Sequence, residues 1–260
     1  MFVRSGGSVG PILLLVHGLA ANAEVWRGVI TLAKQHWPGR WIAPDLRGHG
    51  RSPAASGYSY DAYAADLADL VDDDRPVTVL GHSMGGVVGL TLATGTFGVS
   101  VQRVIGVGIK VVWTDEEAAK MLAQAARPPA VFADRDEAVT RGLRLAGLQG
   151  LVDATSAVAA AGVLEDPGGA VESPGGAVES LGGFRVAFDP AVNGVGPPPM
   201  ADLLAAAQTE VRLACGESDP MVSVNQLRML DPSAVELPGL GHNAHVENPE
   251  QLWRTLMAPS

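Results

Sequence analysis

The sequence predicts an α/β fold built on a mostly parallel, doubly wound sheet. Strand-sized apolar segments alternate with helical segments along the chain, an order that places helices on both faces of a parallel sheet. Several strand segments are nearly continuous apolar runs, which is typical of strands buried on both faces. The expected strands are Ile12–Val16, Trp41–Ala43, Val77–Leu80, Val101–Val107, Val211–Ala214 and Ala234–Leu237. The expected helices are Val25–Gln35, Tyr60–Asp72, Met84–Thr94 and Pro249–Met257.

The alternation stops between Lys110 and Gln208. A seven-residue segment, Pro167–Ser173, is repeated there at once as Pro174–Ser180. Two copies this short predict a surface loop, because solenoid repeats are roughly 20 to 50 residues long. Three helices are expected in the same region, over Asp115–Ala126, Asp134–Leu148 and Val152–Val163. We therefore expect a core formed by residues 1–109 and 210–260, and a helical cap formed by residues 110–209 with a Gly/Pro-rich loop at 167–180.

The composition of the chain indicates which kinds of binding partner and which cellular location to expect. The chain has 260 residues and a formal net charge of −10 without a basic stripe, which argues against nucleic acid and anionic membranes. No apolar run approaches the roughly 18 residues of a membrane span, and no signal-peptide pattern follows the run that begins at Pro11. The lone cysteine, Cys215, is expected to pack in the core and fits a reducing, cytoplasmic location. The sequence leaves the oligomeric state open.

The most specific motif is Gly81-His82-Ser83-Met84-Gly85. It follows an apolar strand and precedes a helix-forming run, the context that a nucleophile elbow requires. In such an elbow the turn is so tight that the serine adopts a strained backbone conformation and its hydroxyl stands exposed above the sheet. Ser83 is therefore the candidate nucleophile.

A serine hydroxyl has a high pKa and needs a base, an orienting acid and an oxyanion site. His242 fits the base best, because it follows Gly241 in the loop after the last strand, whereas His245 is expected to be a neighbour that packs or contacts substrate. Asp219, in the loop after the strand that ends near Cys215, is the candidate acid. The alternative acids are Glu217 and Asp115.

Together these segments resemble the α/β-hydrolase family, in its small, cap-bearing, esterase-like group. The matching segments lie in the family's order and are Val16–Leu19, Pro44–Ser52, Gly81–Gly86, Gly216–Asp219, and Gly241–His242 with Glu247–Pro249. The resemblance implies a Ser-acid-His triad of Ser83, Asp219 and His242. It also implies an oxyanion hole formed by the backbone N–H groups of Leu19 and Met84.

The chain departs from the family in two places. The family has two strands before the segment that ends in His-Gly, whereas only one short strand, Phe2–Arg4, fits here. We therefore expect either that the sheet lacks one strand or that the start of the chain is truncated. The duplicated heptapeptide is not a family feature either. Because it falls in the expected cap, it leaves the shape of the substrate site open.

The expected activity is hydrolysis of a carboxylic ester of a small molecule through an acyl-enzyme, with no metal or organic cofactor. A serine at position 83 disfavours dehalogenase and epoxide-hydrolase chemistry, which uses aspartate at the elbow. Carbon–carbon bond hydrolase, lactonase, amidase and perhydrolase activities remain alternatives, as does a ligand sensor that signals to a protein partner. The candidate substrate contacts are His17, Trp26, His82, Trp113, Met121 and His245.

Overall fold

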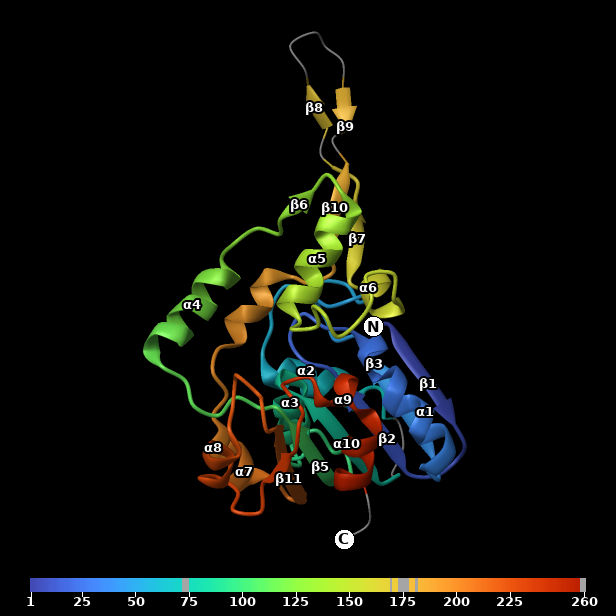
Figure 1. Ribbon diagram of the computed structural model, residues 1–260, viewed down its shortest axis with the longest axis vertical. Coiled ribbons are helices and arrows are strands. Elements are labelled where there is room, and N and C mark those ends of the chain that lie inside the picture. Colours follow the sequence, from blue (N-terminus) through green and yellow to red (C-terminus); the bar gives the residue numbers. More distant parts are fainter. Residues whose placement is uncertain (72–74, 169, 173–177, 181, 258–260) are drawn as a thin grey trace.

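The computed structural model describes residues 1–71, 75–168, 170–172, 178–180 and 182–257. Within these residues the largest sheet has seven strands in the order β1-β3-β2-β4-β5-β11-β12 (Figure 1). Strand β1 runs antiparallel to β3, and every other pair is parallel, so the predicted sheet is confirmed. The strands are β1 Val3–Gly7, β2 Ile12–Val16, β3 Arg40–Pro44, β4 Val77–His82, β5 Val101–Val107, β11 Glu210–Gly216 and β12 Val235–Leu237. As expected, a single strand precedes β2 in the described part of the chain.

Helices cover both faces of this sheet. Residues Leu13 and Leu15 of β2 pack in one core cluster and Ile12 and Leu14 in the other, because successive side chains of a strand point to opposite faces. One face is covered by the short 3-10 helix η1 Ala23–Trp26, with α1 Arg27–His36, α9 Ala244–Glu247 and α10 Pro249–Leu256. The other is covered by α2 Tyr60–Ala68, α3 Met84–Leu92, α7 Met200–Ala206 and α8 Val224–Arg228. None of the described helices combines the length and the apolar character needed to cross a membrane.

The expected core helices are present with shifted ends. The helix expected from Val25 begins as the 3-10 turn η1 and becomes α-helical at Arg27. Helix α2 ends at Ala68, and its expected end at Asp72 lies outside the described residues. Cys215 is fully buried in the core, as predicted, and burial raises the pKa of its thiol to about 11.

The segment of residues 110–209 is not purely helical, which corrects the expected helical cap. Helices α4 Asp115–Ala125 and α5 Arg135–Leu145 are present, but the third expected helix, Val152–Val163, is reduced to α6 Ala157–Ala161. Gly162 ends α6, and the chain continues as a strand. The strands β6 Val131–Phe132, β7 Val163–Asp166 and β10 Gly183–Val186 form an antiparallel sheet in the order β6-β10-β7.

The two copies of the heptapeptide pair with each other. The first copy supplies β8 Ala170–Glu172 and the second supplies β9 Val178–Ser180, which run antiparallel. This ladder follows β7 and precedes β10 in the chain, and Figure 1 shows it at the far end of the inserted segment. The expected loop is therefore partly a strand pair, and its residues 169 and 173–177 lie outside the described residues.

Most of the inserted segment lies over one end of the large sheet (Figure 1). Backbone hydrogen bonds join it to the loop after β3, from the Gly50 N–H to the Ala187 carbonyl (2.7 Å) and from the Asp189 N–H to the Gly48 carbonyl (2.8 Å). Helix α7 falls within residues 110–209 but packs against α3, with Met200 buried in the main core.

Candidate active site

The candidate site lies where the strand order of the sheet reverses. The chain passes from β2 to β3 on one side and then returns to place β4 on the other side of β2. In open α/β sheets, ligands bind at the carboxyl ends of the strands beside such a reversal. The segment His17–Leu19 follows β2 directly and Ser83 follows β4, so the two candidate segments lie at this point.

Ser83 is the single residue between β4 and α3. Its backbone angles are φ 49° and ψ −119°, a left-handed conformation that a non-glycine residue adopts at a cost of about 1–3 kcal/mol. The flanking glycines allow the strand and helix to approach. A Cβ at Gly81 would lie 2.4 Å from the Gly85 carbonyl oxygen, and a Cβ at Gly85 would lie 2.2 Å from the Val16 carbonyl oxygen. The motif thus has the geometry of an elbow that presents Ser83.

The candidate base and acid lie in contact. His242 Nδ1 lies 2.9 Å from Asp219 Oδ2 and 3.1 Å from Oδ1. The Asp219 side chain is fully buried, whereas that of His242 is 17% exposed. With Nδ1 donating its proton to the carboxylate, Nε2 of the neutral imidazole carries the free lone pair. The pair therefore orients His242 to accept a proton on Nε2.

Neither alternative acid faces His242. Glu217 Oε2 accepts a hydrogen bond from the Gly239 N–H (2.8 Å). Asp115 lies in the first turn of α4, within the inserted segment. Of the three carboxylates considered, Asp219 is the one in contact with the imidazole.

Three side chains hold the backbone on either side of His242. Glu247 accepts hydrogen bonds from the N–H groups of Gly241 (2.6 Å) and Asn243 (3.1 Å). His82 Nε2 donates to the His242 carbonyl (3.0 Å). Asn243 Nδ2 donates to the Gly147 carbonyl of the inserted segment (3.0 Å). These positioning roles were not predicted, although Glu247 belongs to one of the segments that carry the family resemblance.

The candidate oxyanion donors are the N–H groups of Leu19 and Met84, which follow the neighbouring strands β2 and β4. The N–H groups of Leu19 and Met84 donate no hydrogen bond to any part of the chain that the structure describes. Leu19 lies in the turn His17–Leu19 that follows β2, called here the β2 turn, and Met84 is the first residue of α3. Unpaired N–H groups at the start of a helix favour negative charge.

His17 holds the β2 turn instead of lining the substrate cavity. Its Nδ1 donates to the Gly18 carbonyl (2.8 Å), and its Nε2 accepts from the Leu46 N–H (2.9 Å), a pattern that fits the neutral imidazole. Burial lowers the pKa of this imidazole, although the Asp45 carboxylate opposes the effect. The predicted substrate contact at His17 is therefore corrected to a positioning role.

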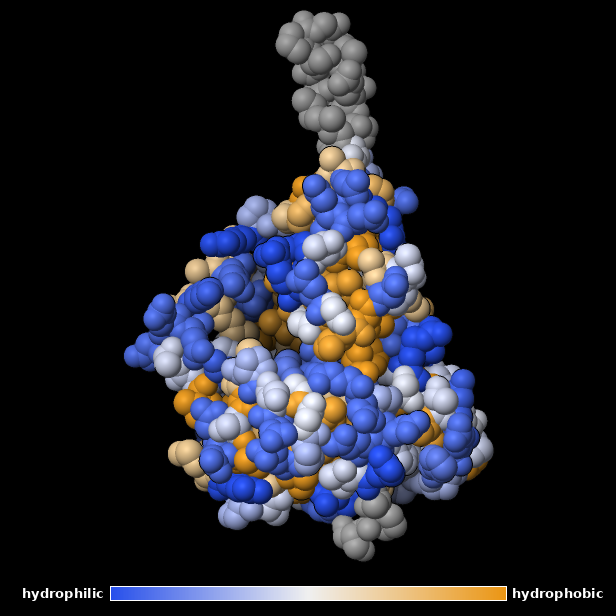
Figure 2. Space-filling view, in the orientation of Figure 1, coloured by the Kyte–Doolittle hydropathy of each residue, from blue (hydrophilic) through white to orange (hydrophobic). Residues whose placement is uncertain are grey.

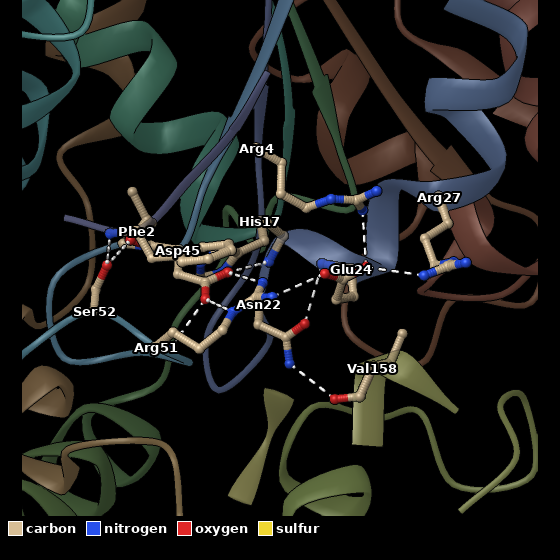
Figure 3. Close-up of polar contacts among 12 residues, drawn as sticks. Phe2, Arg4, His17, Asn22, Glu24, Arg27, Asp45, Arg51, Ser52 and Val158 are labelled. Carbon is tan, nitrogen blue, oxygen red and sulfur yellow. Dashed lines mark hydrogen bonds and ion pairs between the residues drawn. The ribbon is translucent and has the colours of Figure 1, made fainter. Parts of the chain in front are cut away.

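A partly buried ion-pair network lies close to His17 (Figure 3). Asp45 accepts hydrogen bonds from the Ala23 N–H (2.7 Å) and Arg51 Nε (2.8 Å). Burial alone would raise the pKa of the Asp45 carboxyl, but the hydrogen bonds from Arg51 and Ala23 keep it below its ordinary value. Glu24 pairs with Arg51 (2.9 Å) and Arg4 (2.8 Å), which ties β1 to the same network.

A cavity of about 290 Å³ opens beside Ser83 and His242. Ser83 and His242 line it, together with the predicted contacts His82, Trp113 and Met121. Its apolar walls also include Val87, Ile109, Leu145, Pro198 and Met221.

Two further predicted contacts do not reach this cavity. Trp26 and His245 are buried beside each other, with ring centroids 4.5 Å apart, in the layer that holds α1 and α9. His245 also packs against His82, at 4.4 Å between centroids. The predicted substrate contacts at Trp26 and His245 are therefore corrected: both are packing residues behind the site.

The buried histidines predict a loss of stability in acid. Burial is the main reason that the pKa of His245 is lowered to about 3, and the nearby His242 lowers it further. Unfolding returns the imidazole to a pKa near 6.5, so the unfolded state binds more protons below that pH. The full stability is thus present above about pH 6.5 and falls by about 1.4 kcal/mol per pH unit for this group as the pH decreases.

Replacing His245 by phenylalanine is expected to reduce this acid sensitivity. Neither ring nitrogen of His245 has a hydrogen-bond partner among the described residues, so phenylalanine sacrifices no such bond. The free energy of unfolding, measured by urea denaturation between about pH 6 and pH 4, reports how many more protons the unfolded state binds than the native state. We expect this number to be smaller by about one in the variant. If the free energy of unfolding depended on pH as steeply in the variant as in the natural protein, His245 would have to be protonated in the native state.

Gly108, which the sequence analysis did not single out, leaves room for the imidazole of His242. It follows β5 with φ +67°, and a Cβ there would lie 3.2 Å from both His242 Nδ1 and the His242 carbonyl oxygen. We expect Gly108→Ala to lower kcat about 10- to 100-fold by displacing His242. Ester hydrolysis by the folded variant checks this. Gly98→Ala is the matched control, because Gly98 has φ +69° with no atom within 4 Å, and it should leave kcat unchanged.

The sequence comparison decides the family. Residues 13–255 match the Alpha/beta hydrolase family, nearly the whole described chain. The chain belongs to the alpha/beta hydrolase family.

Individual relatives show a narrower likeness. The chain is 41% identical to Lipase LipV of Mycobacterium tuberculosis over 97 residues, which are 36% of each protein. The first curated relatives are matched over 26% to 36% of their own length. The fold also resembles the thioesterase domain from the curacin biosynthetic pathway (TM-score 0.74, 22% identity, 98% of this chain and 94% of that one). It resembles E-2-(acetamidomethylene)succinate hydrolase as well (TM-score 0.75, 23% identity, 98% and 92%).

Proposed function

We propose that this protein is a serine hydrolase that cleaves a carboxylic ester of a small molecule through an acyl-enzyme. The observation that carries the proposal is the constellation at one cavity. Ser83 stands on the strained elbow, and His242 lines the same cavity with its Nδ1 on the buried Asp219 carboxylate. This is the arrangement of a nucleophile, a base and an orienting acid.

In the first half of the reaction, His242 Nε2 accepts the proton of the Ser83 hydroxyl while Oγ attacks the carbonyl carbon. The oxyanion that forms receives hydrogen bonds from the N–H groups of Leu19 and Met84, each contributing roughly 3–4 kcal/mol to the transition state. Asp219 stabilises the imidazolium. His242 then gives its proton to the leaving alkoxide, and the acyl group remains on Ser83.

In the second half, water replaces the alkoxide. His242 takes a proton from the water, which attacks the acyl carbonyl, and the same two N–H groups receive the second oxyanion. Collapse of this intermediate returns the proton to Ser83 and releases the acid. Both halves use the same groups, so no additional residue is required.

The inserted segment acts as a cap in this proposal. It supplies Trp113, Met121 and Leu145 to the lining of the cavity beside Ser83, and the residues that follow the strands of the large sheet supply other parts of the lining. Asn243 and Asn22 join it to the loops of the base and the oxyanion donors, through the carbonyls of Gly147 and Val158. Because ligand cavities commonly measure roughly 300–1,000 Å³, a cavity of about 290 Å³ favours a small acyl or alcohol group.

A labelling experiment combined with a substrate panel tests the proposal. A fluorophosphonate is expected to label one serine per chain, and peptide mapping is expected to place the label on Ser83. Short-chain esters are expected to be hydrolysed over many turnovers, ahead of matched lactones and amides. A label on another residue, or a single turnover followed by a stable acyl product, would contradict the proposal; the second result would favour a ligand sensor.

A further inference from the structure

A second cavity adjoins the catalytic one. Its volume is about 310 Å³, and it shares two lining residues, Leu19 and Leu145, with the catalytic cavity. Its walls are mainly apolar and include Ala20, Pro128, Phe132, Val186 and Phe188. Because the Leu19 N–H is a proposed oxyanion donor, a carbonyl group held there lies at the boundary between the two cavities.

The charged residues of both cavities have one sign. The chain contains 28 acidic and 18 basic residues, yet no aspartate or glutamate lines either cavity. The four charged side chains that do so are all cations: Lys110 and Arg144 line the catalytic cavity, and Arg127 and Arg141 line the second. The chain as a whole is negatively charged, but the charged side chains at the two cavities are all positive, so positive charge is concentrated where substrate would bind.

Three of these cations have no counter-ion. Lys110 pairs with Glu117 of α4. By contrast, the guanidinium groups of Arg127, Arg141 and Arg144 make no ion pair or hydrogen bond with any other residue that the structure describes. The acid nearest along α5 is Glu137, one turn before Arg141, and the two do not form an ion pair. The guanidinium groups are therefore available to an external anion.

We propose that the ester substrate is anionic and that its carboxylate binds in the second cavity, on Arg127 and Arg141. This inference rests on the proposed function and names its substrate class. A guanidinium presents paired N–H donors that match a carboxylate. The apolar walls accommodate the chain between the carboxylate and the carbonyl at Ser83. Figure 2 shows the surface hollowed beside α4, with hydrophilic residues along the rim and hydrophobic ones deeper inside.

The test compares matched aryl esters of straight-chain acids that end in a carboxylate, a methyl or an ammonium group. We expect kcat/KM to be highest for the carboxylate-ended ester and lowest for the ammonium-ended one. Since exposed ion pairs are weak and screened, the preference for carboxylate over methyl is expected to be about fivefold at low salt and smaller at high salt. The double variant R127Q/R141Q is expected to bring this ratio close to one.

Two further variants separate charge from structure. The double variant R127K/R141K keeps the charge and is expected to retain part of the preference. Arg135→Gln removes one positive charge, where R127Q/R141Q removes two, at a residue of the start of α5 that lines neither cavity, and it should leave the ratio unchanged. Equal rates for the carboxylate- and ammonium-ended esters, or an equal loss of preference in Arg135→Gln, would overturn the inference.

A binding measurement keeps the inference independent of turnover. Calorimetric titration of azelate monomethyl ester into the Ser83→Ala variant is expected to show binding that R127Q/R141Q weakens about fivefold. If the methyl-ended ester is hydrolysed through Ser83 without any charge preference, the inference fails and the proposed function stands. If no ester is turned over, the proposed function fails, and the titration alone decides whether the second cavity binds a carboxylate.

Discussion

Replacing Ser83 by glycine is expected to abolish turnover and, at the same time, to stabilise the fold. The loss in kcat is expected to be about a millionfold, because removal of a triad serine disables the whole constellation. The stabilisation follows from the backbone angles of φ 49° and ψ −119°, which glycine adopts without the steric cost of a Cβ. We expect a gain of about 1 kcal/mol in the free energy of unfolding, measured by urea denaturation.

Ser83→Ala is the matched control for this pair of effects. Alanine removes the nucleophile but keeps the Cβ, and the Ser83 side chain makes no capping hydrogen bond to α3 that alanine would lose. The alanine variant is therefore expected to be as inactive as the glycine variant and as stable as the natural protein. Residual turnover in both variants would point to another nucleophile. Equal stability of the two variants would show that the elbow stores no strain.

The elbow was predictable because its geometry is local. A strand, a Gly-x-Ser-x-Gly turn and a helix follow one another within Val77–Leu92, so each element is visible in the sequence without knowledge of distant contacts. The central strands were predictable for a related reason, since burial of both faces leaves continuous apolar runs such as Ile12–Val16. The sequence therefore predicted the fold and the placement of Ser83.

The inserted segment was predicted less well because its strands depend on distant partners. Strand β10 pairs with both β6 and β7, and no local pattern in Gly183–Val186 identifies either partner. The same limit applies to Arg127, which follows α4, and Arg141, which lies in α5, because the two line one cavity only in the folded cap.

Position along the chain also misled the assignment of substrate contacts. Trp26 and His245 are near the oxyanion turn and the base in sequence, but η1 and α9 place them in the layer behind the sheet. Gly108, by contrast, belongs to no motif, and it approaches His242 because β11 pairs with both β5, which precedes Gly108, and β12, which precedes the loop of His242. Tertiary packing decides both cases.

Replacing Asp219 by asparagine is expected to lower kcat about ten-thousandfold while leaving the fold intact. The Asp219 carboxylate has two engagements: Oδ1 accepts a hydrogen bond from the Met221 N–H (2.8 Å), and Oδ2 lies 2.9 Å from His242 Nδ1. In the variant, the amide oxygen is needed by the Met221 N–H, so the NH₂ group faces His242. The imidazole must then accept on Nδ1 and carry its proton on Nε2, where it cannot take the proton of Ser83.

The rate of ester hydrolysis at saturating substrate measures this effect, and fluorophosphonate labelling reports the same loss of nucleophilicity at Ser83. Glu217→Gln is the matched control, since it makes the same chemical change in the same loop. The glutamine oxygen can still accept from the Gly239 N–H, so the control is expected to keep kcat within about twofold. A larger loss in Glu217→Gln than in Asp219→Asn would reverse the assignment of the acid. Comparable small losses in both would show that the orientation of His242 depends on Glu247 and His82 rather than on a carboxylate at Nδ1.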